Sequence, residues 1–202
     1  MRIIEVSRKM DKGTVALYFH FGSVKQLFDD ADQRPLPVTE LSESAEDALF
    51  SYADEYFASK PLAFEIGLPE NELSSEKGEL VAGAVQRHFF RRIPDLEHEQ
   101  KLVRREGFYS LLLMIGTFAA AGIFISLSIA TLLGFSSLTP ETVTPQVILI
   151  ILIGFILMIA NWVTFWATIE IFIYDYRNLC RKIRIYKKIS RSPVTVRGYA
   201  ME

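Results

Sequence analysis

Three aspartates lie close together in the stretch LFDDADQRPLPVTEL: Asp29, Asp30 and Asp32. Closely spaced carboxylates are ligands that Mg²⁺ and Ca²⁺ favour in proteins. This cluster is therefore the candidate metal site of the chain, although it lacks the glycine and the terminal glutamate of a calcium-binding loop. The alternative interpretation of the same residues is a solvent-exposed acidic turn.

Other sequence signals for catalysis are absent. The three histidines, His20, His88 and His98, do not have the spacing of metal ligands, and a single cysteine cannot form an intrachain disulfide. The sequence contains neither a glycine-rich phosphate loop nor a nucleophile elbow. We therefore expect no cofactor and favour a protein that is not an enzyme.

Polar residues recur on one face of an apolar segment near the C-terminus. Asn161, Thr164 and Thr168 are separated by three and four positions, which places them on one side of a helix. An amide in hydrocarbon is costly unless it is hydrogen-bonded. This face is therefore expected either to bond across a helix interface or to line a polar path through a membrane.

Small residues form a ridge on the preceding apolar segment at a spacing of four. They are Gly122, Ser126, Ala130 and Gly134. Such a ridge lets another helix approach closely, which is how helices associate in lipid. We expect it to pack against the second apolar helix of the same chain, and the further hypothesis is a contact to another chain in addition.

The two apolar segments predict transmembrane helices. Gly107–Phe135 has 29 residues without a charge, and Val147–Ile169 has 23. A helix needs roughly 20 apolar residues to cross a bilayer core of ~30 Å, so both are long enough. The short polar linker between them contains two prolines and suits a turn between antiparallel helices.

Basic residues indicate the orientation. They flank both apolar segments, while the linker contains no Lys or Arg, so the positive-inside rule places both termini in the cytoplasm. The cations expected at lipid headgroups are Arg177, Arg181, Lys182, Arg184, Lys187 and Lys188. In the same stretch, residues 179, 183, 186 and 189 share an apolar face, which predicts an amphipathic helix lying on an anionic leaflet.

Residues near the cytoplasmic end of the second span are expected to act as anchors. Trp162 and Trp166 are aromatic interface residues. Glu170 and Asp175 fall at headgroup level, where we expect them to pair with neighbouring Arg or Lys side chains.

The N-terminal region predicts a small α+β domain, a small sheet with helices on one face. Alternation of apolar and polar residues predicts strands, and a period near 3.6 predicts helices. The expected strands are Ile3–Ser7, Thr14–Phe21 and Leu62–Leu68, with a hairpin turn over residues 10–13, and the expected helices are Glu43–Ala58 and Ser75–Arg91. Pro94 suits the first turn of a new helix, which would run on through the first span. Val194–Tyr199 is a candidate strand that returns to the sheet.

Five segments follow from these patterns. They are a cytoplasmic α+β domain (1–93), a stalk with the first transmembrane helix (94–135), an external loop (136–146), a second transmembrane helix (147–175) and a basic amphipathic cytoplasmic tail (176–202).

Several stretches resemble a family of uncharacterised bacterial two-span integral membrane proteins with a small cytoplasmic N-terminal domain. The matching stretches are VKQLFDDADQRPLP, ELSESAEDALFSYADE, PLAFEIGLP, AVQRHFFRR, NWVTFWATIEIFIYDY and RKIRIYKKIS. The resemblance covers most of residues 24–190 and implies an inner-membrane location with the two-span topology. It implies no activity and no catalytic residues.

The leading functional expectation is a non-enzymatic membrane protein that presents a cytoplasmic docking or assembly domain. Its partners would be the anionic bilayer and either itself, as a homo-oligomer, or another membrane protein. The near balance of 22 Lys+Arg and 24 Asp+Glu argues against nucleic acid. The alternatives are a homo-oligomeric ion channel or transport accessory subunit, and a membrane-tethered metal-dependent enzyme.

Overall fold

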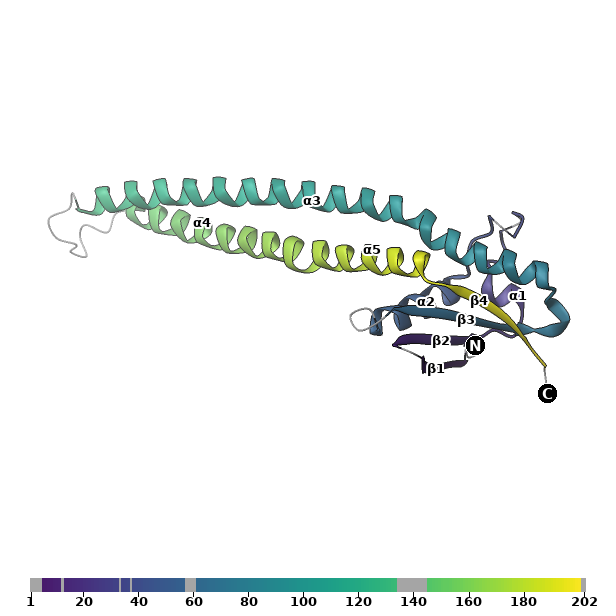
Figure 1. Ribbon diagram of the computed structural model, residues 1–202. Coiled ribbons are helices and arrows are strands. Elements are labelled where there is room, and N and C mark those ends of the chain that lie inside the picture. The colour runs from purple at the N-terminus through teal and green to yellow at the C-terminus, as the bar shows by residue number, and fades with distance from the viewer. Residues whose placement is uncertain are drawn as a thin grey trace. The chain divides into compact units, whose positions relative to one another are not determined.

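The computed structural model describes residues 5–11, 13–32, 34–36, 38–56, 61–133 and 145–200. These residues belong to two compact units (Figure 1). The α+β unit comprises residues 1–98 and 180–202, and the helix-pair unit comprises Glu99–Leu179.

The α+β unit contains a four-stranded sheet with the order β1-β2-β3-β4. Its strands are β1 (Glu5–Asp11), β2 (Thr14–His20), β3 (Leu62–Pro69) and β4 (Val194–Tyr199). The strands β2, β3 and β4 are parallel to one another, and β1 is antiparallel to β2. The C-terminal strand predicted from the sequence is confirmed, and it adds a fourth strand to the expected three.

The first two strands form the predicted hairpin. Asp11 pairs with Thr14, and Gly13 adopts a φ of 89°, a left-handed conformation that favours glycine. The expected strand boundary was wrong, because Met10 and Asp11 belong to β1, where a turn was predicted. Residues 3 and 4 of the expected first strand lie outside the described residues.

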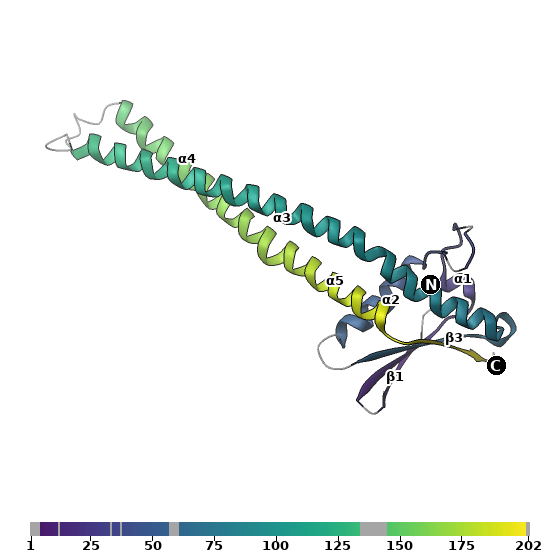
Figure 2. The same ribbon diagram turned by 45° about the horizontal axis from the view of Figure 1, so that its top comes forward.

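One face of the sheet is covered by helices. Alternate side chains of β2 and β3 are buried, and the buried set includes Leu17, Phe19, Phe64 and Ile66. The helices α1 (Val24–Leu27), α2 (Glu43–Glu55) and the start of α3 (Ser75–Leu133) lie on one side of the sheet (Figure 1, Figure 2). A 3₁₀ turn, η1 (Glu70–Glu72), precedes α3. The predicted sheet with helices on one face is therefore confirmed.

Local sequence explains where α2 begins. The Ser42 side chain accepts a hydrogen bond from the backbone N–H of Ala45, and Glu43 and Glu46 lie in the first turn, where the helix dipole favours negative charge. The helix ends at Glu55, three residues before the predicted end at position 58, which lies outside the described residues.

Pro94 lies inside α3, where the sequence predicted the start of a separate helix. Proline removes one backbone N–H and usually breaks a helix interior. Buried side chains on both sides of it, Phe89, Ile93 and Leu96, anchor the helix to the α+β unit. These contacts explain why α3 continues through the proline.

The C-terminal segment belongs to the α+β unit. In α5 (Tyr176–Arg191), Ile185 and Ile189 are 0% exposed, and the Tyr186 ring lies 5.2 Å from Phe89 and 5.6 Å from Phe50 between ring centroids. Burying one isoleucine fully is worth about 1.5–3 kcal/mol. The apolar face predicted to lie on a leaflet is therefore packed inside the protein, which corrects the interfacial interpretation of this helix.

The helix-pair unit contains two helices long and apolar enough to cross a membrane. They are α3 and α4 (Pro145–Glu170), followed by a π-helical turn, η3 (Ile171–Asp175). Their most apolar 18-residue windows have mean hydropathies of 2.2 and 2.7, and only 6% and 11% of these windows is buried. Most of the linker expected at 136–146 lies outside the described residues.

Candidate functional site

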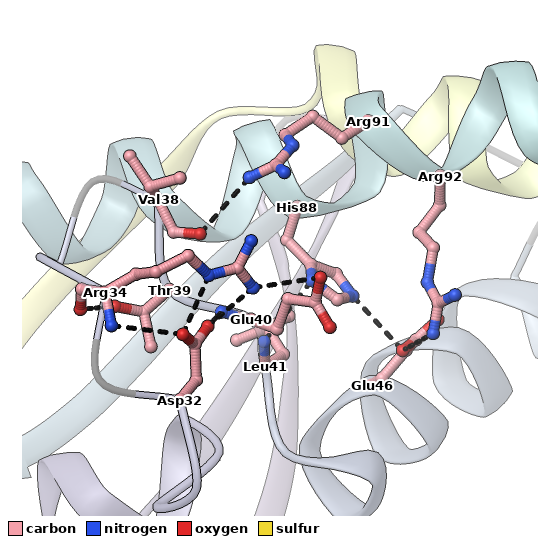
Figure 3. A network of polar contacts seen from close by, with 10 residues as sticks. All are labelled: Asp32, Arg34, Val38, Thr39, Glu40, Leu41, Glu46, His88, Arg91 and Arg92. Atoms are coloured by element: carbon pink, nitrogen blue, oxygen red, sulfur yellow. Dashed lines mark hydrogen bonds and ion pairs between the residues drawn. The ribbon is translucent and has the colours of Figure 1, made fainter.

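A partly buried polar network joins three helices of the α+β unit, and Figure 3 shows the part of it that links α2 and α3. The hydroxyl of Tyr186 on α5 donates a hydrogen bond to Glu46 Oε1 on α2 at 2.5 Å. His88 Nε2 on α3 lies 3.1 Å from Glu46 Oε2. Arg92, one turn later on α3, places its Nη2 atom 3.5 Å from the same oxygen. Glu46 is thus the common partner of side chains from two other helices.

The His88 ring is held from both sides. Its Nδ1 accepts a hydrogen bond of 3.3 Å from the backbone N–H of Leu41, which leaves the proton of the neutral ring on Nε2, towards Glu46. The Nε2–H is not aligned for a full hydrogen bond, so the 3.1 Å approach is a close electrostatic contact. His88 therefore links α3 to the segment before α2 through Nδ1 and to Glu46 on α2 through the close approach of Nε2.

Glu46 is ionised at neutral pH. Its pKa is lowered from 4.5 to about 2, first by His88 and then by the Tyr186 hydroxyl, against the opposing effect of burial. The pKa of Tyr186 is raised by its burial and by the hydrogen bond to Glu46. The network therefore holds one partly buried negative charge with several donors around it, an arrangement that stabilises the packing of α2, α3 and α5.

The acidic loop is ordered by an internal ion pair. Asp32 accepts hydrogen bonds from Arg34 Nε and Nη2, both at 2.7 Å, and from the backbone N–H of Glu40 at 2.8 Å (Figure 3). Arg34 also lies 3.0 Å from a Glu40 oxygen. These contacts lower the pKa of Asp32, with the Arg34 hydrogen bond as the main cause.

The structure does not bring the three predicted metal ligands together. Both oxygens of Asp32 are occupied by Arg34, and Asp29 Oδ1 accepts the backbone N–H of Ala31 at 3.0 Å. Asp30 is exposed. No group of three or more His, Cys, Asp or Glu side chains in the described part of the chain has the arrangement of a metal site. The acidic loop therefore holds its own backbone in place.

The cations predicted to meet lipid headgroups have several different surroundings. Arg181 forms an ion pair of 2.6 Å with Asp54, and Lys182 Nζ lies 5.8 Å from the centre of the Tyr186 ring. Arg177 is exposed. The remaining three line one cleft: Arg184, Lys187 and Lys188.

The polar face of α4 is directed at α3. The hydroxyls of Thr168 and Ser110 lie 2.8 Å apart, and those of Thr164 and Thr117 lie 3.4 Å apart. Asn161 is 7% exposed and donates from Nδ2 to a carbonyl of its own helix, while Oδ1 accepts no hydrogen bond from a described residue. The face therefore contributes to the packing of the helix pair.

The small-residue ridge does not form the α3–α4 interface. Gly122, Ser126 and Ala130 are exposed, and a Cβ added at Gly122 would meet nothing within 4 Å. Gly134 lies outside the described residues. Close packing through this ridge is not found in the described residues: Gly122 lines a cavity with Gly154, Leu157 and Asn161 of α4, and Ser126 and Ala130 are exposed.

The residues expected at the cytoplasmic interface are exposed. Trp162 and Trp166 are 66% and 54% exposed. Glu170 and Asp175 are also exposed, and neither forms an ion pair with a described residue, in contrast to the expectation. The π-helical turn between them places Phe172 against Gly107, where an added Cβ would lie only 3.0 Å from the ring.

No known protein family, curated protein or solved structure matches this chain. The function must therefore be inferred from the geometry of its own residues.

Sequence reasoning missed the Glu46 network. The sequence pattern placed position 46 only within the expected helix Glu43–Ala58, and it placed Tyr186 on the apolar face expected to lie on a leaflet. His88 lies 42 positions and Tyr186 140 positions from Glu46, so no local spacing connects them. Only the presence of a histidine and a tyrosine on otherwise apolar helix faces could have indicated buried polar partners.

Proposed function

We propose that this chain is a non-enzymatic integral membrane protein that presents its α+β unit at the cytoplasmic face as a docking or assembly module. The observation that carries the membrane part is the exposure of its two long apolar helices. Large side chains such as Ile123, Leu127 and Trp162 are each more than 60% exposed. Soluble monomers rarely expose contiguous apolar surface on this scale, whereas a bilayer would cover it.

The distribution of charge supports the orientation. Arg104 and Arg105 precede the first apolar run, and the basic residues of α5 follow the second. The linker contains no Lys or Arg, so both termini lie in the cytoplasm under the positive-inside rule. The inner membrane is the location that the resemblance noted in the sequence implies, and it is part of this proposal.

The open face of the sheet supports a docking role. The face opposite the helices presents Tyr18, His20, Glu65, Arg197 and Tyr199, and no described helix covers it. Arg197 Nε lies 3.2 Å from a Glu65 oxygen, and the His20 and Tyr199 rings have centroids 5.6 Å apart. Aromatic and arginine side chains on one surface are typical of protein interfaces.

Thiol labelling tests the membrane topology. Cys180 is the only cysteine, so a membrane-impermeant maleimide applied to intact cells should leave the wild type unlabelled. A Cys180→Ser chain that carries Ser137→Cys in the linker should be labelled from outside. Labelling of Cys180 in intact cells would contradict the proposed orientation. Release of the chain from membranes by alkaline carbonate would contradict its insertion into the bilayer.

Particle mass tests the assembly role. Native mass spectrometry of the nanodisc-extracted chain should find a homo-oligomer or a complex with a second protein. Tyr18→Lys puts a charge on the open face and should dissociate that particle, while Ser51→Lys puts the same charge on the exposed side of α2 and should not. A wild-type monomer without a partner, or equal behaviour of the two variants, would refute the docking face.

A further inference from the structure

A cavity lies between α3 and α4 in the helix-pair unit. Its volume is about 280 Å³, and its lining includes Phe118, Ala121, Gly122 and Phe124 of α3 and Gly154 and Asn161 of α4. A Cβ added at Gly122 would meet nothing within 4 Å, so this glycine leaves open space beside it. Small side chains on both helices therefore explain why the pair is not closely packed here.

The cavity is open on the side that the proposed membrane would cover. Ala121 and Asn161 are buried, whereas Phe118, Ile125 and Met158 line the same cavity and are exposed. On a helix that spans a bilayer, exposed side chains at this depth face hydrocarbon. A ligand would therefore enter the cavity from the lipid, and it must itself be soluble in lipid.

Asn161 contributes a hydrogen-bond acceptor that the described residues leave unused. Its side chain is 7% exposed, and Nδ2 donates to the Leu157 carbonyl at 3.0 Å. Its Oδ1 accepts no hydrogen bond from a described residue. Buried polar groups in proteins are nearly always paired, because an unpaired one loses its hydration without compensation. The terminal torsion of an asparagine is soft, so a small rotation lets Oδ1 meet a donor in the cavity.

The lining of the cavity disfavours other contents. No charged side chain is among the described residues that line it, so an ion would lie there without a counter-charge. A lipid acyl chain would fill the volume, but it has no donor for Oδ1. A single water molecule has a donor, but its share of liquid volume is only about 30 Å³. The lining therefore favours a mainly apolar molecule that carries a hydroxyl group.

We propose that this cavity binds a lipid-soluble phenol, whose hydroxyl donates to Asn161 Oδ1 and whose ring packs against Phe118 and Phe124. Aromatic rings attract one another in offset and edge-to-face contacts. A cavity of about 150 Å³ holds benzene, so the larger volume here has room for roughly 11 non-hydrogen atoms, the size of an alkyl-substituted phenol. The ring can belong to a small free phenol or to the head of a long-chain phenolic lipid, whose chain would extend into the bilayer. This inference rests on the membrane insertion proposed above and does not involve the open face of the sheet.

Photolabelling of the full chain in phosphatidylcholine nanodiscs tests the site. An alkylphenol that carries a diazirine should label residues 118–125 and 154–161 saturably, as peptide mass spectrometry reports. Competition by thymol tests small phenols, and competition by pentadecylphenol tests phenolic lipids. Their matched hydrocarbons, p-cymene and pentadecylbenzene, lack the hydroxyl. At equal mole fraction in the lipid, a phenol should compete roughly three- to tenfold better than its hydrocarbon, the factor that a hydrogen bond contributes in a bilayer. The pair that shows this preference assigns the source.

Substitutions locate the binding. Asn161→Leu removes the acceptor and should abolish the preference for the phenol over its hydrocarbon. Gly122→Leu fills the cavity and should reduce labelling more than about fivefold, since overpacking costs at least roughly that factor. Gly116→Leu makes the same change on α3 outside the cavity, where an added Cβ also meets nothing within 4 Å, and should not reduce labelling. The two glycine variants keep the test decisive if loss of Asn161 disturbs the helix pair.

Several results would overturn the proposal. Unsaturable labelling spread over all lipid-facing residues would mean that acyl chains fill the cavity, and protection of the cavity in a homo-oligomeric particle would mean that a second copy covers it. Equal competition by phenol and hydrocarbon in both pairs, or equal labelling of the Gly122→Leu and Gly116→Leu variants, would also refute it. Release of the chain by alkaline carbonate would refute membrane insertion and this inference together, whereas a chain that stays inserted without binding phenol would refute this inference alone.

Discussion

Replacing Glu46 by glutamine tests how strongly the buried network holds the α+β unit together. The carboxylate accepts a hydrogen bond from Tyr186 and lies 3.1 Å from His88 Nε2. Glutamine keeps the shape and one oxygen, but it removes the negative charge and presents an amide N–H₂ to a donor-rich site. The variant therefore separates the charge of the network from its packing.

The size of the effect follows from the pKa of Glu46. A carboxyl whose pKa is lowered on folding stabilises the folded state at every pH above its unfolded value, here 4.5, and loses that contribution as the pH falls towards about 2. At neutral pH the contribution is fully present, and its upper limit is about 3.4 kcal/mol. The side chain of Glu46 is 14% exposed, so solvent screening reduces this limit only modestly. Glutamine retains the hydrogen bond from Tyr186, worth about 1 kcal/mol, so we expect a loss of about 2 kcal/mol.

Hydrogen exchange measured by mass spectrometry can detect this loss in the full chain in nanodiscs at neutral pH. Amides of β3 and α2 that exchange through opening of the α+β unit should exchange about 30-fold faster in the Glu46→Gln variant. Glu43→Gln removes a charge from an exposed position of the same helix and should change exchange by less than about threefold. Equal exchange in the two variants would refute the view that the charge of Glu46 stabilises the unit.

Three further predictions concern other parts of the chain. Thr168→Val removes a 2.8 Å hydroxyl contact with α3 and should lower the stability of the helix pair in nanodiscs by about 0.6 kcal/mol, so a loss above about 2 kcal/mol would contradict a simple packing role. Gly107→Ala should lower the thermal midpoint of the helix pair, because its Cβ would lie 3.0 Å from a phenylalanine ring, whereas Gly116→Ala, with nothing within 4 Å, should not. Asp32→Asn should release Arg34 and speed hydrogen exchange and proteolysis in the acidic loop while leaving α2 protected, and unchanged cleavage would show that the ion pair does not order the loop.

Local pattern was sufficient for much of the architecture. A charge-free run of 29 residues predicts a helix that can span a bilayer whatever surrounds it, because backbone groups in hydrocarbon must bond within the helix. The β1–β2 hairpin is set by strand alternation and by a glycine with positive φ at its turn. The helix α2 begins at Glu43 as predicted, because Ser42 supplies the N-cap next to it.

Tertiary structure decided which partner each amphipathic face meets. The apolar stripe of α5 is equally compatible with a lipid leaflet and a protein core, and only packing against Phe50 and Phe89 assigns it to the core. The small-residue spacing at Gly122 predicted close contact between helices, yet Gly122 only lines a cavity beside α4, and Ser126 and Ala130 are exposed. Helical periodicity defines a face but contains no information about what covers it.

The candidate sites show the same division. The basic residues were visible in the sequence. The cleft that they line forms because β4, which follows α5, pairs with β3 and so brings the end of α5 next to the start of β3. The Glu46 network requires side chains separated by up to 140 positions, which meet because three helices pack on one face of the sheet. The sequence by itself determined most of the strands and helices, their polarity and the length of the two apolar helices. The choice of contacts among them depended on long-range packing, because many pairings satisfy the same local patterns and only the complete core selects one.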